Sequence, residues 1–290
     1  MSRCRTRIDD RNLRIAGALV VLLVAALVAL LATSGQAHAG ARCDTARVSP
    51  REVANAASTA LTVAQALDDA NAPVAIVSRV GTDLSEQGLR YSHAGFAVRD
   101  HVDGRWTIVH LLNDCGSDRA ALHAEGLVNF FADDLVVQDA RIVWLEPTMA
   151  QRLAQRLNAL PRDPLLSHRY NLIARPGSAA DQNSTAWIME ELGAAIPPTL
   201  EVHDRRQAWR LAQANGFEPD TIHIPYTQRI LGGLFGTNIA FTDHSVATRL
   251  RGDYPVTTVR SILDWLRRAG YLQAEREWRS GRWAAVPGPA

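Results

Sequence analysis

The chain has 290 residues, and its 31 basic and 30 acidic side chains leave a formal net charge of +1 at pH 7. Every basic side chain is an arginine, which excludes the lysine chemistry of Schiff bases and of phosphate-binding loops. The charges are balanced and form no basic run, so we expect no nucleic-acid partner. With 47% hydrophobic residues, the chain can bury a full core.

The first 39 residues have the pattern of an export segment. Several arginines precede an apolar run from Ile15 to Ala32, and Ala37-His38-Ala39 then forms a small-residue cleavage pattern. The run is longer than a typical signal core and just short of the roughly 20 residues that span a bilayer. Residues 1–39 are therefore predicted to be a signal peptide or an N-terminal membrane anchor. The rest is expected to be periplasmic or secreted, or held at the inner membrane by residues 15–32, with no other membrane contact.

Residues 40–277 are predicted to form a single domain that begins with a helix. Ser49 and Glu52 form a capping box with Pro50 at the first helical position, which predicts a helix from residue 50 to about residue 69. Asp103-Gly104 is a strong hairpin signal between two strands. Strands are expected at 74–80, 91–98, 106–112, 141–145 and 221–224.

Further helices are expected on the C-terminal side of the strands, at 148–160, 184–195, 205–215 and 257–269. Residues 278–290 are rich in Gly, Pro and Ala and are predicted to be a flexible tail. Strands in the middle of the chain with helices on both flanks predict the α+β class, an antiparallel sheet packed with helices.

Two distant segments carry the strongest functional signal. Tyr91-Ser92-His93-Ala94-Gly95-Phe96 predicts a strand that carries a histidine, and Gln182-Asn183-Ser184-Thr185-Ala186-Trp187 predicts a helix that opens with a hydroxyl group. This order resembles the circularly permuted papain-like hydrolases, the group of NlpC-type cell-wall peptidases and lecithin-retinol acyltransferases. Their nucleophile segment reads Asn-Cys, where this chain has Asn183-Ser184. The resemblance implies a permuted papain-like architecture.

A second resemblance covers most of the chain after the export segment. Its landmarks are residues 91–93, 109–113 and 129–131, and they resemble a bacterial envelope family called domain of unknown function 2145. That family implies no activity. The Asn129-Phe130-Phe131 landmark is expected to pack in the core.

The candidate catalytic pair is Ser184 as nucleophile and His93 as its base. A helix N-terminus lowers a hydroxyl pKa by less than one unit, so Ser184 needs a base that accepts its proton. The free N–H groups of Ser184 and Thr185 would then face a developing oxyanion. The alternative is a plain helix cap at Ser184 and a core histidine at His93.

The group that orients His93 depends on the hairpin register. With Asp103-Gly104 as a two-residue turn, Asp114 faces His93, whereas a loop centred between His101 and Val102 sets His110 opposite His93. The acyltransferase branch resembles the second arrangement, with two histidines on paired strands. Both His110 and Asp114 therefore stay candidates for the third catalytic position.

The residues beside this pair complete the expected site. Tyr91, Asn183 and Thr185 are the candidate ligand-binding residues. Cys43 and Cys115 are predicted to form a disulfide in an oxidising compartment, with two separate thiols as the alternative. The remaining histidines are scattered without metal-binding spacing, so neither a metal nor a cofactor is expected.

Two functions stay open at this point. One is a catalytically silent or serine-variant relative that keeps a papain-like groove and binds an envelope ligand. The other is a Ser184-dependent amide or ester hydrolase, or acyl transferase, that acts on peptidoglycan peptides or acyl groups. Hydroxyl in place of thiolate removes intrinsic nucleophilicity, which favours the first.

Overall fold

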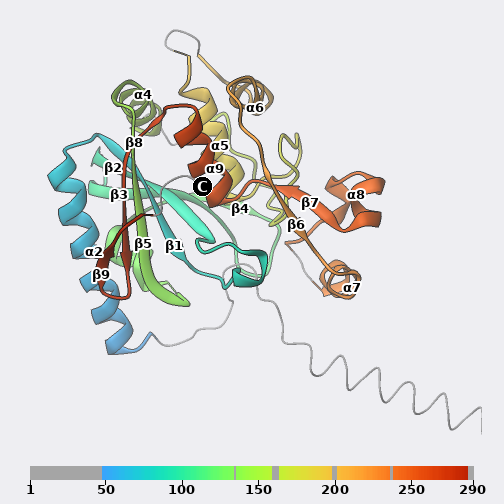
Figure 1. The fold of residues 1–290 in the computed structure, drawn as a ribbon, viewed down its shortest axis with the longest axis horizontal. Helices are drawn as coiled ribbons and strands as arrows, with labels where there is room; N and C mark the ends of the chain where they lie inside the picture. Colours follow the sequence, from blue (N-terminus) through green and yellow to red (C-terminus); the bar gives the residue numbers. More distant parts are fainter. Residues whose placement is uncertain (1–47, 134, 159–162, 198–200, 236–237, 287–290) are drawn as a thin grey trace, which may run out of the picture. The chain divides into compact units, whose positions relative to one another are not determined.

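A seven-stranded antiparallel sheet forms the centre of the computed structural model (Figure 1). The structure describes residues 48–133, 135–158, 163–197, 201–235 and 238–286. The order across the sheet is β4-β3-β2-β1-β5-β8-β9. The strands are β1 (Val74–Val80), β2 (His93–His101), β3 (Gly104–Asn113), β4 (Ala120–Gly126), β5 (Val137–Leu145), β8 (Leu272–Arg279) and β9 (Arg282–Ala284).

Helices cover both faces of this sheet, and strand alternation sends neighbouring side chains to opposite faces. Odd-numbered residues of β2 such as Ala97 pack with helices α2 (Pro50–Ala70) and α3 (Leu127–Ala132), and we call this side the α2 face. Even-numbered residues such as Phe96 pack with α4 (Pro147–Asn158), α5 (Ser184–Ala194) and α9 (Val259–Arg268), and we call this side the α5 face. The central strand β1 is buried on both sides.

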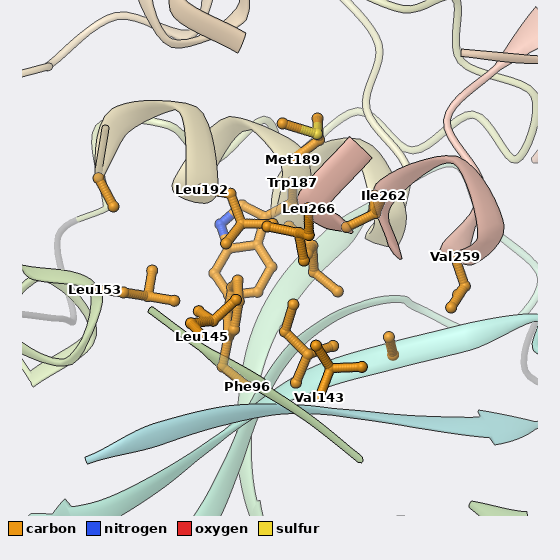
Figure 2. Packing of buried hydrophobic residues seen from close by; sticks show 14 of the residues in the cluster. Phe96, Val143, Leu145, Leu153, Trp187, Met189, Leu192, Val259, Ile262 and Leu266 are labelled. Carbon is orange, nitrogen blue, oxygen red and sulfur yellow. The ribbon is translucent and has the colours of Figure 1, made fainter. Parts of the chain in front are cut away.

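The core on the α5 face is large and rich in aromatic and branched side chains. Figure 2 shows Trp187 and Leu192 of α5 together with Leu266 of α9 above Phe96 and Leu145 of the sheet. The rings of Phe96 and Trp187 are 5.5 Å apart in an edge-to-face arrangement. All residues of α5 are buried, because the helix lies between the sheet and its neighbouring helices.

A smaller layer follows α5 in the chain. It contains α6 (Arg205–Ala214), α7 (Tyr226–Phe235), α8 (Val246–Arg251) and two short strands, β6 (Asp220–His223) and β7 (Asp253–Val256). The two strands pair antiparallel with each other. Short 3-10 helices lie at Ser85–Gln87 and Phe241–Asp243.

The predicted α+β class, an antiparallel sheet packed with helices, is confirmed. The first helix has the predicted capping box at Ser49 and Glu52, and it ends at Asn71 in the left-handed conformation. The strand β4 was not predicted, because its alanine-rich sequence has weak β propensity. Helix α3 was not predicted either.

The predicted flexible tail, residues 278–290, begins with residues that belong to the sheet. Trp278 and Arg279 belong to β8, and Arg282–Ala284 forms β9, which pairs with it. The turn has Ser280 and Gly281 at positive φ, a conformation that suits a tight hairpin. The sheet therefore extends beyond residue 277, and residues 287–290 lie outside the described part.

The described residues belong to one compact unit. The predicted export segment, residues 1–39, lies outside the described residues. Among the described residues, no helix has both the length and the apolar character to cross a bilayer.

Candidate functional site

Residues His93 and His110 lie on the paired strands β2 and β3. The register pairs Phe96 with Val109 and His101 with Gly104, so the turn consists of residues 102 and 103. This register lies between the two alternatives that the sequence allowed. Continued by one residue, it sets His110 across from Gly95, and His110 is then the diagonal neighbour of His93 on the α2 face.

Gly95 gives the two histidines room to approach. A Cβ atom at this position would lie 2.5 Å from Ile108 Cγ2 and 3.1 Å from His110 Cβ. Contacts this short are not tolerated without displacement of the neighbouring strand. Glycine at residue 95 therefore allows the His110 ring to lie over β2 and to reach His93.

A chain of polar contacts runs from β2 through β3 to β4. His93 Nε2 lies 2.8 Å from His110 Nδ1, and His110 Nε2 lies 3.1 Å from Glu125 Oε1. The second contact is close in distance but does not form a hydrogen bond. A carboxylate at Nε2 favours the proton on that nitrogen, so His110 Nδ1 accepts a hydrogen bond from His93 Nε2–H. His93 Nδ1 then has its lone pair free, and it has no partner among the described residues.

The imidazoles of His93 and His110 are both neutral at pH 7. Burial lowers the pKa of His93 well below its ordinary value, and the positive charge of Arg79 and the neighbouring His110 lower it further. Burial also lowers the pKa of His110, while the contact with Glu125 opposes that shift. His93 is therefore a hydrogen-bond acceptor of low basicity.

Arg79 and Phe130 enclose the two histidines on the α2 face. Arg79 of β1 is the register partner of His93, and its guanidinium lies 4.5 Å from the centre of the Phe130 ring. It donates hydrogen bonds to the Phe130 carbonyl and to Asp133. The Phe130 ring lies 6.0 Å from His93 and 5.4 Å from His110. Helix α3 thus covers the pair, and Phe130 and Phe131 are fully buried, as predicted.

Ser184 lies at the start of α5, on the α5 face. The N-cap residue is Asn183, whose Oδ1 accepts a hydrogen bond of 2.7 Å from the Ala186 N–H. The buried Ser184 hydroxyl forms a hydrogen bond with Tyr170, whose pKa is raised to about 12, chiefly by burial. Ser184 therefore belongs to the packed start of a helix.

The predicted contact between Ser184 and His93 is wrong. His93 packs against Phe130 on the α2 face, whereas Ser184 begins the helix that packs on the α5 face. Alternation along β2 is the physical reason, because Ala94 and Phe96 turn toward α5 and His93 turns away from it. The sheet separates the proposed base from the proposed nucleophile.

Comparison with known proteins identifies the chain at the level of a family. A model for a family described as an uncharacterized protein conserved in bacteria (DUF2145) matches residues 66–266, which is more than half of the chain. The chain belongs to this family. No curated protein and no solved structure matches the chain.

Membership of this family does not test the papain-like architecture, which stays a prediction. The papain-like resemblance depends on a base that meets a nucleophile at a helix start, and the geometry above lacks that meeting. Of the two candidates for orienting His93, His110 contacts it. Asp114 is exposed in the turn after β3, where its backbone bonds Arg119 and Ser117.

The candidate ligand-binding residues have internal partners. Tyr91 donates a hydrogen bond of 2.7 Å to Glu277 Oε1 of β8. Asn183 Nδ2 donates to the Leu172 carbonyl, and Thr185 Oγ1 donates to the Thr257 carbonyl. These contacts fix the ends of β2 and α5 in place.

The cysteine and metal predictions have different outcomes. Cys115 is exposed in the turn after β3 and is disulfide-bonded. Its expected partner, Cys43, lies outside the described residues, so the pairing stays a prediction. Within the described ranges, no group of three or more His, Cys, Asp or Glu side chains could hold a metal ion.

Two residues of this site were missed by sequence reasoning. Glu125 lies on the unpredicted strand β4, and its contact with His110 depends on the β3 and β4 register, which pairs Ile108 with Glu125. Arg79 lies in the otherwise apolar strand β1, and an arginine in such a strand was the sequence signal that could have pointed to it. A buried arginine in such a strand needs partners, and these came from α3.

Proposed function

We propose that this protein is an exported protein of the bacterial cell envelope that binds a ligand and does not hydrolyse it at Ser184. One observation carries the proposal: Ser184 and His93 lie on opposite faces of the sheet. A serine hydroxyl without a base is a poor nucleophile at neutral pH. Tyr170, Asn183 and the buried start of α5 give Ser184 a structural role instead.

Two features support export. Arginines followed by an apolar run and a small-residue site form the pattern of a bacterial leader. The disulfide at Cys115 suits an oxidising compartment such as the periplasm. A fusion of residues 1–60 to alkaline phosphatase, which is active only after export, tests this part. We expect activity, and an inactive, stable fusion would contradict it.

A serine-reactive probe tests the absence of hydrolysis at Ser184. We expect a fluorophosphonate to leave the folded full chain unlabelled. The experiment includes Ser184→Ala, His93→Ala and, as a matched control, Ser85→Ala at an exposed serine. Labelling of the wild type that disappears in the first two variants and persists in the third would overturn the proposal.

Ligand binding is tested with the cell wall itself. Purified peptidoglycan sacculi are mixed with the full chain and sedimented, with a heat-unfolded sample of the same chain as a control for nonspecific adsorption. We expect the folded chain to sediment in a saturable manner. Equal recovery with and without sacculi would contradict envelope binding to this polymer.

A second candidate function is hydrolysis by a water molecule that His93 activates. The alignment of Glu125, His110 and His93 favours it, because such a chain fixes the tautomer of the terminal imidazole and leaves His93 Nδ1 free. Activity on a simple ester would then survive Ser184→Ala and fall in His93→Gln and Glu125→Gln. Equal background hydrolysis by all four proteins would reject this candidate.

A further inference from the structure

A surface pocket is lined by residues from the C-terminal end of α2 and from the strands β5 and β8. Its volume is about 360 Å³, within the range of small-molecule sites. The lining combines small apolar residues with few polar ones: Ala66, Asp69, Ala70, Ala72, Trp144, Gln273, Ala274 and Arg276. Four of the eight are alanines, so the ligand meets a shallow apolar floor with polar groups at its sides.

Trp144 lines this pocket with a buried indole whose N–H lies beneath the surface. Its side chain is 4% exposed, and its indole Nε1 has no hydrogen-bond partner among the described residues. Buried indole N–H groups usually find an acceptor, since an unmade hydrogen bond costs free energy. Trp144 and Ala274 are register partners on β5 and β8 and both line the pocket, so a ligand that enters it comes to the indole.

The side of the pocket formed by α2 is negative. Asp69 lies in the last turn, where Oδ1 accepts a hydrogen bond from Gln65 and Oδ2 has no partner in the described part of the chain. The last turn of α2 has no basic residue of its own, and the Arg99 guanidinium instead binds the carbonyl of the C-cap residue Asn71. Asp68, by contrast, accepts hydrogen bonds from Arg105 and Trp106. An ammonium group fits beside Asp69.

The side formed by β8 is positive. The Arg276 guanidinium lies 5.2 Å from the centre of the Trp283 ring on β9, and it has no carboxylate partner within the described part of the chain. Stacking on an indole holds an arginine in place while its N–H groups stay available. A planar fork of this kind binds a carboxylate through two hydrogen bonds. Gln273 adds a neutral amide on the same side.

We propose that this pocket binds the zwitterion of an amino acid with a small side chain, with its ammonium at Asp69 and its carboxylate at Arg276, beside the Trp144 indole. The four alanines present methyl groups to an apolar side chain of the ligand. The inference deepens the proposed function, on which it rests, because it gives the class of ligand that the protein binds.

Nuclear magnetic resonance of the full chain in detergent micelles tests the assignment. The chain has seven tryptophans, so the indole N–H resonance of Trp144 is identified with Trp144→Phe. We expect alanine to move this resonance in a saturable manner. Propionate lacks the ammonium and ethylamine lacks the carboxylate, and each is expected to bind at least about tenfold more weakly.

Charge variants give the second arm of the test. Asp69, Arg276 and Arg268 are all exposed, so their substitution is compatible with folding. We expect Asp69→Asn and Arg276→Gln each to weaken alanine binding about tenfold, and the matched control Arg268→Gln on α9 to leave it unchanged. A Trp144 resonance that ignores alanine, or that responds equally to propionate, would overturn the assignment.

The two proposals fail separately. If alanine does not bind but the chain still sediments with sacculi and resists the fluorophosphonate, the pocket assignment fails alone. If alanine binds at Trp144 but the fluorophosphonate labels Ser184, the proposal of a non-hydrolysing protein fails and the pocket assignment stands.

Discussion

His93 Nε2 lies 2.8 Å from His110 Nδ1, although the two residues are diagonal neighbours on β2 and β3. The contact exists because residue 95, which stands between them on the same face, is a glycine. The strand register, the glycine and the two imidazoles therefore form one structural unit. Each of them can be altered separately.

Substitution of Gly95 by alanine is expected to destabilise the fold. The added methyl group would meet Ile108 and the Cβ atom of His110, and overpacking of this kind costs about 1–3 kcal/mol. Urea unfolding of the full chain measures the loss. Gly126→Ala is the matched control, since a Cβ atom there meets no atom within 4 Å. Equal unfolding free energies for both variants would contradict the close approach of β2 and β3.

Replacement of Asn183 by alanine is expected to cost more stability than replacement of Ser184. Asn183 caps α5 through Ala186 and also donates to the Leu172 carbonyl, and loss of an N-cap costs about 0.5–2 kcal/mol. Ser184 loses one hydrogen bond with Tyr170, worth about 1 kcal/mol. Thermal unfolding of the two variants compares them. A larger loss from Ser184→Ala would show that the helix start is held differently.

Below about 6.5, the ordinary pKa of histidine, buried His93 is expected to lose its own contribution to stability as the pH drops. The folded-state pKa of His93 is well below that value, chiefly because of burial. The unfolded chain therefore takes up a proton in this range that the folded chain refuses, so the stabilisation present above the unfolded pKa is lost as the pH falls.

The variant His93→Gln tests that dependence. We expect it to lower the slope of the acid limb, the part of a plot of unfolding free energy against pH below about 6.5, since glutamine does not titrate. The control is His203→Gln at an exposed histidine. An acid limb that keeps its slope in His93→Gln, or loses it in His203→Gln, would assign the effect to other groups.

The two buried glutamates of α5 are expected to make stability fall as the pH rises from about 4.5, the ordinary pKa of a glutamate, to about 8. Burial in α5 raises the pKa of Glu191 to about 8, with a further contribution from the negative charge of Asp163. The folded chain keeps a proton that the unfolded chain has released, so stability decreases with rising pH until the folded pKa is passed. Glu190, with a pKa of about 7, adds to the decrease at its lower end.

Glu191→Gln is expected to flatten this alkaline limb, since glutamine imitates the protonated acid and keeps a neutral group beside Asp163. The slope removed is at most about 1.4 kcal/mol per pH unit. Unfolding free energies at several pH values measure it, with exposed Glu86→Gln as the control. A wild-type curve that rises over this range would mean that Arg156 keeps Glu191 ionised in the folded state.

Local signals in the sequence located most of the elements. The capping box at Ser49 predicts the start of α2, and the apolar run from residue 74 matches β1 in both bounds. Side-chain alternation also places Phe96 and His93 on different faces of β2. The observed hairpin register differs by two residues from each of the two registers that turn chemistry suggested. The reason is that the register is set by all the paired residues of β2 and β3 and not by the turn alone.

The sequence by itself determined the α+β class, the family and the helices and strands with strong local patterns. Only the tertiary structure decided which helix covers which face of the sheet. That choice places α5 with Ser184 on the side of Phe96, and α3 with Phe130 on the side of His93. Periodicity reports that a side chain points to one of two faces, whereas the long-range packing of helices determines what it meets there.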